Sequence, residues 1–252
     1  GTGLRTDFAF ARYETTGLFD ATFGSAGSFT GTLATSDNSA TLLKSLVVLT
    51  GGEIVAGGDV TDGVAGTLRM AAVRITPTGG LDATFGTGGA AIVTSVSLSS
   101  ASALVRQSDG KLVLAGFGGD GVTLGPAFHR MQANGAPDAG FGTGGLVVLA
   151  STPFEEWLTA IVRADDRLVV AGRRFETVGT TAILHAFTAA GATDGTFGTG
   201  GVAPVVAGAS ADVINRMALL ADGRILAGGQ VQTFGAITGI LARYTAAGAL
   251  DP

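Results

Sequence analysis

The chain has 252 residues, a formal net charge of −5, 46% hydrophobic residues, 42 glycines and no cysteine. The lack of cysteine excludes disulfide bonds and thiolate metal sites, and high hydrophobicity with few charges argues against a disordered chain. Lys and Arg total 15 without an evident basic cluster, and no apolar run reaches the roughly 18 residues of a membrane span, so we expect no nucleic-acid partner and no membrane helix.

A short motif recurs along the chain at a nearly constant spacing. One copy is the segment Leu81-Asp82-Ala83-Thr84-Phe85-Gly86, and its Asp and Phe have equivalents in the other copies. Successive motif aspartates lie 62, 56, 56 and 57 residues apart. Such a period indicates one supersecondary unit used repeatedly, as in propellers and other arrays. The motif residues are Asp20, Asp82, Asp138, Asp194 and Asp251, with Phe23, Phe85, Phe141 and Phe197.

Each repeat predicts four short strands in chain order. In one complete repeat these strands are 103–106, 111–116, 128–131 and 146–149, and an Asp109-Gly110 turn joins the first two. Asp-Gly between two apolar runs is a strong hairpin signal. The other first strands are 42–49, 160–163 and 217–220, and the other second strands are 53–57, 167–172 and 224–228. The other third strands are 10–13, 72–75, 184–187 and 241–244, and a further fourth strand is 90–94.

Four short antiparallel strands per repeat, with periodic Gly and Phe, predict an all-β fold and specifically a β-propeller with four-stranded blades. We expect a single array over 1–252, with about four repeats of 56–62 residues and a partial repeat at the N-terminus, as part of a longer chain. A right-handed β-helix is the main alternative, although its coils are usually shorter and lack Asp-Gly hairpins. The repeats are approximately 1–35 (partial), 36–98, 99–154, 155–210 and 211–252.

Most recurring residues predict structural roles. We expect each motif Phe to pack between neighbouring blades and each motif Asp to cap its own turn. His129 and His185 occupy one position in successive repeats, too far apart to share a metal whose ligand bonds are ~2 Å, so we interpret them as structural. Calcium at the motif Asp is an alternative, but the alternating Asp/Asn pattern of a calcium loop is missing. A ladder of arginines predicts salt bridges within the scaffold: Arg12, Arg74, Arg130 and Arg243.

Three segments carry a resemblance to a known family. They are Asp-Gly-Lys-Leu-Val-Leu-Ala-Gly at 109–116, Ala-Arg-Tyr at 242–244 and Leu-Asp-Ala-Thr-Phe-Gly-Thr-Gly-Gly at 81–89. With them the whole chain resembles the bacterial delta-60 repeat, and its blade plan is similar to NHL-type propellers. The resemblance implies a bacterial protein, secreted or exposed at the cell surface, without an established activity. The chain departs from the pattern at Ala186, where Arg is expected, and at Asp165-Asp166 in place of Asp-Gly; we interpret both as drift.

Residues that differ between repeats are the better candidates for function, because the shared positions already have structural roles. The connectors from fourth to first strands and from second to third strands share one face, the variable face, and the repeat over 155–210 differs most there. Aromatic residues and Arg are enriched at binding hot spots. We predict a recognition patch; the alternative is that Trp157 fills a core gap and the charges pair locally. The selected binding residues are Glu155, Glu156, Trp157, Arg173, Arg174 and Phe175.

Two classes of function stay open, and whether the chain is an enzyme is undecided. The first is a non-catalytic module for binding, adhesion or extracellular assembly, with a protein or carbohydrate ligand at the variable face and self-association as a further kind of partner. It needs no catalytic residue, metal or cofactor. The second is a hydrolase or lyase acting on a polysaccharide, which needs acidic side chains converging at the ring centre. The candidate acids are Asp37, Asp59, Asp62, Asp120, Glu155, Glu156 and Asp212.

Overall fold

The computed structural model describes residues 6–33, 39–61, 66–119, 124–150, 153–205, 212–233 and 236–251. The strands of these residues form five antiparallel sheets, which we number as blades 1 to 5 in chain order. Blade 1 contains β1 (Phe8–Ala11) and β2 (Ser28–Gly31). Blade 2 contains β3 (Ala40–Val48), β4 (Ile54–Thr61), β5 (Leu68–Ile75) and β6 (Ala90–Ile92). Blade 3 contains β7 (Leu98–Arg106), β8 (Leu112–Gly119), β9 (Leu124–Met131) and β10 (Leu146–Val148). Blade 4 contains β11 (Glu155–Val162), β12 (Leu168–Phe175) and β13 (Thr180–Phe187). Blade 5 contains β14 (Val213–Leu219), β15 (Ile225–Thr233) and β16 (Ala236–Tyr244).

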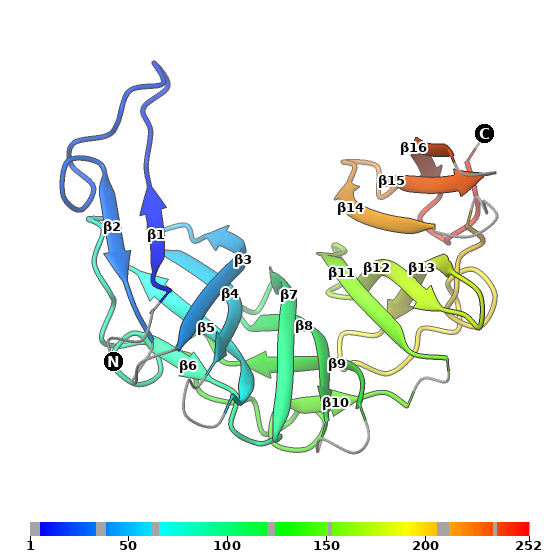
Figure 1. Ribbon diagram of the computed structural model, residues 1–252, viewed down its shortest axis with the longest axis horizontal. Coiled ribbons are helices and arrows are strands. Elements are labelled where there is room, and N and C mark those ends of the chain that lie inside the picture. Colours follow the sequence, from blue (N-terminus) through cyan, green and yellow to red (C-terminus); the bar gives the residue numbers. More distant parts are fainter. Residues whose placement is uncertain are drawn as a thin grey trace.

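The five blades follow one another along an open arc, with blade 1 at one end and blade 5 at the other (Figure 1). The first strands β3, β7, β11 and β14 contact one another in successive blades and lie on the inner side of the arc. Within each sheet the strands follow in chain order, as β3-β4-β5-β6 does in blade 2. This is the arrangement of propeller blades around an axis, and it confirms the predicted all-β propeller fold.

The hairpin turns lie where the sequence predicts them. Gly52 has a φ of 88° between β3 and β4, and Gly110 has a φ of 87° between β7 and β8, a conformation that glycine adopts without steric cost. Asp166 takes the same position in blade 4 with a φ of 61°, which is uncommon for a residue with a side chain. Every strand pair within the sheets is antiparallel, which rules out the parallel coils of a β-helix.

A β-bulge recurs at one place in blades 2 to 5, in the pairing of the first strand with the second. Because the bulge falls at the same point each time, the four inner strands share one geometry, and positions can be compared directly between blades. Blade 4 differs at its outer edge, where the described residues form only a single bridge between Val202 and His185. The bulges lie between Leu43 and Ser45, Ala101 and Ala103, Trp157 and Thr159, and Ile214 and Arg216.

The hydrophobic core is divided among the interfaces between successive blades. Phe85 shows the principle: its side chain is fully buried and lies against the turn of blade 3, where a Cβ on Gly135 would be 3.1 Å from the ring. The adjacent Gly86 N–H donates to the carbonyl of Asn134 at 2.7 Å. The prediction that the motif Phe packs between blades is therefore confirmed. The equivalent buried residues are Phe23, Phe141 and Phe197.

Blade 5 exposes a surface whose equivalent is buried in blades 2, 3 and 4. Leu241 in β16 is 75% exposed. The residues at the same position in blades 2, 3 and 4 are Ala72, Phe128 and Leu184, each of which is 0% exposed beneath the neighbouring blade. The exposure of Leu241 therefore identifies an uncovered interblade surface.

Candidate functional site

The Arg–Asp pairs predicted from the repeat are present, and they also tie one blade to the next. In blade 2, Arg74 Nε donates to Asp82 Oδ2 at 2.8 Å, and Arg74 Nη1 donates to the carbonyl of Ala133 in blade 3 at 2.8 Å. Asp82 Oδ1 accepts from the Thr84 N–H at 3.0 Å, so the motif Asp caps its own turn as predicted. Hydrogen bonds from Thr84 and Arg74 hold the pKa of Asp82 below its usual range. The equivalent pairs are Arg12–Asp20, Arg130–Asp138 and Arg243–Asp251.

Blade 4 lacks the ladder arginine, because Ala186 stands at that position, but its motif carboxylate is still paired. Arg167 Nη1 donates to Asp194 Oδ2 at 2.7 Å and to the Thr196 hydroxyl at 2.9 Å. Burial acts to raise the pKa of Asp194, but hydrogen bonds from Thr196 and Arg167 outweigh it and hold the pKa below its usual range. The equivalent residues Lys111 and Arg224 reach the motif Asp in blades 3 and 5, which keep the ladder arginine, so this pairing is a shared feature of the repeat. The interpretation of Ala186 as drift stays a prediction.

Asp166, the other departure from the repeat pattern, also makes specific contacts. Its carboxylate accepts from the Ser108 N–H at 2.6 Å and from the Ser108 hydroxyl at 2.5 Å. Its backbone carbonyl accepts from Gln107 Nε2 at 2.9 Å. Both partners belong to the turn of blade 3, so an Asp at this position of positive φ links two blades in a way that Gly could not.

The predicted site residue Trp157 lies in the core rather than on the surface. Its side chain is 1% exposed, and its ring centroid is 4.7 Å from that of Phe128 and 5.3 Å from that of Phe187. The indole N–H points toward Glu155 Oε2 at 3.4 Å. Trp157 therefore packs in the core between blades 3 and 4, as the alternative interpretation has it.

Glu155 and Arg174 form a largely buried pair next to this core. Arg174 Nη2 and Nε donate to Glu155 Oε1 at 2.7 and 3.0 Å, and His185 Nδ1 lies 3.4 Å from Glu155 Oε2. These residues and Trp157 line a pocket of about 420 Å³ between blades 3 and 4. Burial lowers the pKa of His185, although the charge of Glu155 acts in the opposite direction. His185 Nε2 has no hydrogen-bond partner among the described residues.

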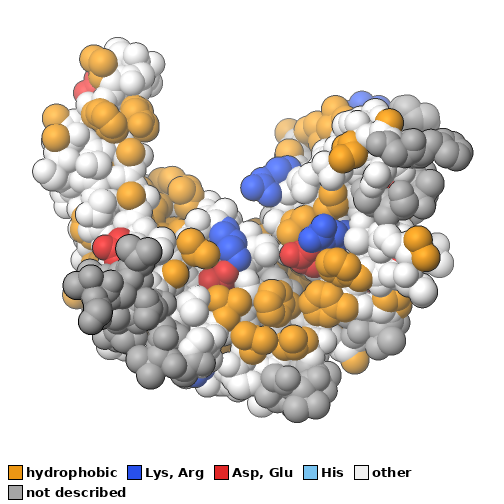
Figure 2. Space-filling view, viewed as in Figure 1, with side chains coloured by type: hydrophobic (Ala, Val, Ile, Leu, Met, Phe, Trp, Pro, Cys, Tyr) orange, Lys and Arg blue, Asp and Glu red, His pale blue; other side chains and the backbone are white. Residues whose placement is uncertain are grey.

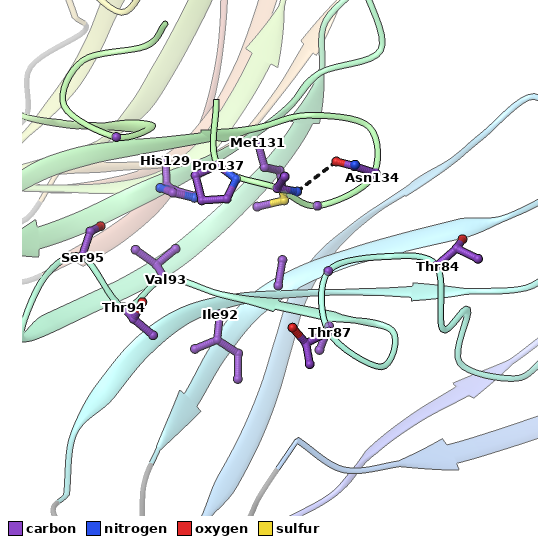
Figure 3. A pocket seen from close by; sticks show the side chains of 16 residues that line it. Thr84, Thr87, Ile92, Val93, Thr94, Ser95, His129, Met131, Asn134 and Pro137 are labelled. Carbon is purple, nitrogen blue, oxygen red and sulfur yellow. Dashed lines mark hydrogen bonds between the residues drawn. The ribbon is translucent and has the colours of Figure 1, made fainter. Parts of the chain in front are cut away.

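His129 lies at the same position one blade earlier, in a separate pocket of about 460 Å³ between blades 2 and 3 (Figure 3). Val93, Met131 and Pro137 line this pocket with it. Burial lowers the pKa of His129 to about 4. The two histidines thus occupy different interblade pockets, and the described ranges contain no group of three His, Asp or Glu side chains that could hold a metal ion.

The remaining predicted residues contribute to an aromatic patch at the variable face. Phe175 is 38% exposed, and the guanidinium of Arg173 lies 4.9 Å above its ring. Arg173 Nη2 pairs with Glu156 Oε2 at 2.6 Å. The ring centroid of Phe154 is 6.0 Å from that of Phe175 and 6.3 Å from that of Phe117, which belongs to β8 of blade 3. We call Phe117, Phe154, Glu156, Arg173 and Phe175 the aromatic patch.

The candidate acids of a polysaccharide enzyme are dispersed in the part of the chain that the structure describes. Asp59 is buried and held by Lys44, and it accepts from the Ser100 hydroxyl at 3.0 Å and the Ala101 N–H at 2.8 Å. Glu155 and Glu156 each pair with an arginine, as described above, and Asp212 Oδ1 accepts from the Gln232 N–H at 3.3 Å. The candidates Asp37, Asp62 and Asp120 lie outside the described residues.

The repeated blades and their interblade Arg–Asp ties define a propeller-type repeat protein. Segments 52–85, 107–141 and 220–252 match the family model described as "Domain of unknown function (DUF5122) beta-propeller". Two of these segments end at a motif Phe and the third ends just after Asp251, so the match supports a propeller-type repeat family with the same unit as the structure. A search of curated proteins found no match. Within the described residues, no helix has the length and apolar character needed to cross a membrane.

Proposed function

We propose that the chain is a non-catalytic recognition module of a bacterial secreted or surface protein, and that the aromatic patch binds a protein or carbohydrate ligand. The aromatic patch is the observation that carries the proposal. It combines a partly exposed Phe with a guanidinium stacked on it, and both residue types are enriched at protein interfaces relative to the rest of the surface. Planar aromatic rings with few rotatable bonds supply contact area to either class of ligand at a low entropic cost.

The ion pair within the aromatic patch supports a binding role rather than a catalytic one. Glu156 and Arg173 neutralise each other across two paired strands, β11 and β12, and therefore fix the position of the guanidinium above Phe175. A preorganised side chain loses less conformational entropy when a ligand binds. Both charged groups already have partners within the folded chain, as expected of a fixed binding surface.

The proposal is tested with immobilised bacterial polysaccharides and extracellular proteins. We expect Phe175→Ser to abolish binding that the unaltered chain shows, and Arg173→Gln to weaken it. Leu18→Ser is the matched control, because Leu18 is 68% exposed in a turn of blade 1 on the other face. Binding that survives Phe175→Ser would contradict the site, and release of oligosaccharides from a bound polysaccharide would contradict a non-catalytic role.

A further inference from the structure

The inner side of the arc carries a second surface, at the ends of the inner strands opposite the aromatic patch. This inner hollow has a volume of about 580 Å³ and draws residues from blades 2, 3, 4 and 5. The space-filling view shows hydrophobic side chains along the hollowed inner side of the arc, with basic and acidic side chains among them (Figure 2). The residues that matter for its chemistry are Val48, Val105, Arg106, Val162, Arg163 and Leu219.

The floor of the inner hollow is aliphatic and accessible. Val48 on β3 is 65% exposed, and Leu219 on β14 is 36% exposed. Val105 and Val162 continue the apolar surface between them on β7 and β11, where they are half-buried. Contiguous exposed aliphatic surface is favourable to cover, at about 25 cal/mol per Å², and such surface commonly marks a binding site.

Two guanidinium groups border this floor without partners. The side chains of Arg106 and Arg163 make no hydrogen bond and no ion pair with any described residue, whereas the arginines of the interblade ladder are all held by carboxylates. Arg106 is exposed and Arg163 is half-buried. Guanidinium groups that are not neutralised by the protein are available to bind carboxylates in a bidentate manner.

The acids next to the hollow do not cancel these charges. Asp166 is a lining residue, but Ser108 already donates to both of its carboxylate oxygens. Asp165 pairs with Arg167, with 3.2 Å between Oδ2 and Nε. Two unpaired arginines against the single lining carboxylate of Asp166 leave the hollow with an excess of positive charge, in a chain whose net charge is −5.

We propose that the inner hollow binds an acidic, aliphatic peptide segment, with carboxylates on Arg106 and Arg163 and aliphatic side chains on the floor. Charge complementarity selects an anionic partner, and the aliphatic floor selects one that carries apolar side chains beside its carboxylates. The lining residues include no aromatic ring, so neither sugars nor nucleic-acid bases have a surface on which to stack. This second site is independent of the aromatic patch and of the function proposed for it.

The test measures binding of a fluorescein-labelled peptide of alternating Glu and Leu by fluorescence anisotropy. We expect the double variant Arg106→Gln, Arg163→Gln to weaken binding at least tenfold, and Val48→Asp to weaken it severalfold by repulsion and lost apolar contact. Arg216→Gln is the charge-matched control: Arg216 is exposed, lies outside the hollow, and donates from Nη1 to the carbonyl of the adjacent Asn215. Circular dichroism checks that the variants fold, which we expect because neither Arg has a partner to lose.

Several outcomes decide the proposal. A second labelled peptide, in which Gln replaces every Glu, is the uncharged control ligand. The proposal is supported if the Glu/Leu peptide binds, the Gln/Leu peptide does not, and Arg216→Gln binds like the unaltered chain. It is overturned if the Glu/Leu peptide does not bind, if the Gln/Leu peptide binds equally, or if Arg216→Gln weakens binding as much as the double variant. Tighter binding of polygalacturonate than of the peptide, lost in the double variant, would reassign the hollow to an acidic polysaccharide.

Discussion

Replacing Arg167 by Ala removes the guanidinium that pairs with the motif carboxylate of blade 4, where Ala186 stands at the ladder position. Asp194 then loses its only cationic partner within 4 Å among the described residues, while its bonds from the Thr196 N–H at 3.1 Å and hydroxyl at 2.6 Å remain. The side chain of Asp194 is 4% exposed and that of Arg167 is 36% exposed, so the pair lies at the edge of solvent. We expect the folded state to retain a carboxylate that is incompletely satisfied.

The magnitude follows from these exposures. An exposed ion pair contributes about 0.2–1 kcal/mol, and leaving a buried acceptor without its charge-assisted hydrogen bond costs about 1–3 kcal/mol. Solvent reaches Arg167, and Thr196 still satisfies one carboxylate oxygen, so the loss lies toward the lower end. We expect Arg167→Ala to lower the free energy of unfolding by about 1–2 kcal/mol.

Urea denaturation followed by circular dichroism measures this change. Arg163→Ala is the control, because Arg163 has no partner among the described residues, and we expect it to change stability by less than about 0.5 kcal/mol. Adding Ala186→Arg to the Arg167→Ala variant should restore stability, because the ladder arginines pair from that position. The reasoning is refuted if Arg167→Ala is no more destabilising than Arg163→Ala.

Three further predictions concern the core, a turn and a titrating group. Trp157→Ala should lower the free energy of unfolding by about 3–5 kcal/mol in urea denaturation, and a loss below ~1 kcal/mol would contradict its placement in the core. Gly86→Ala should destabilise more than Gly88→Ala, because both residues have positive φ but only at Gly86 would a Cβ collide with a backbone carbonyl, that of Ala90; equal melting temperatures would contradict this. His129 has a native pKa of about 4, so from its ordinary value of 6.5 down to that value the unfolded chain takes up a proton that the folded chain does not. The free energy of unfolding should therefore decrease as the pH is lowered through this window, by at most about 3 kcal/mol from His129. The decrease should be less steep in His129→Leu, and identical pH profiles of the two proteins in urea denaturation would count against the burial effect.

The sequence predicts the blade well because each part of a blade has a local signal. Asp109-Gly110 marks a hairpin through turn chemistry alone, and the spacing between Asp82 and Phe85 places a carboxylate on its own turn and a ring against the next blade. These features depend on residues close together in the chain. They are therefore readable before any long-range contact is known.

The candidate site is less predictable because it depends on contacts between strands and between blades. The sequence pattern favours Trp157 because it is the one Trp of the chain, but the strand geometry turns its side chain into the core. Phe117 was missed because it joins the aromatic patch from the neighbouring blade. One signal in the sequence could have found Phe117. Each second strand contains a glycine at the same repeat position, and the side chain after that glycine is of a different chemical type in each blade: Asp59, Phe117, Arg173 and Gln230. The binding role of the selected residues stays a prediction.

The contacts between blades couple the stability of each blade to that of its neighbours. The main contacts between strands of different blades join neighbours only, so the stability of each blade depends on itself and on the blades beside it. A substitution in one blade should therefore change the stability of that blade and its two neighbours more than that of a distant blade.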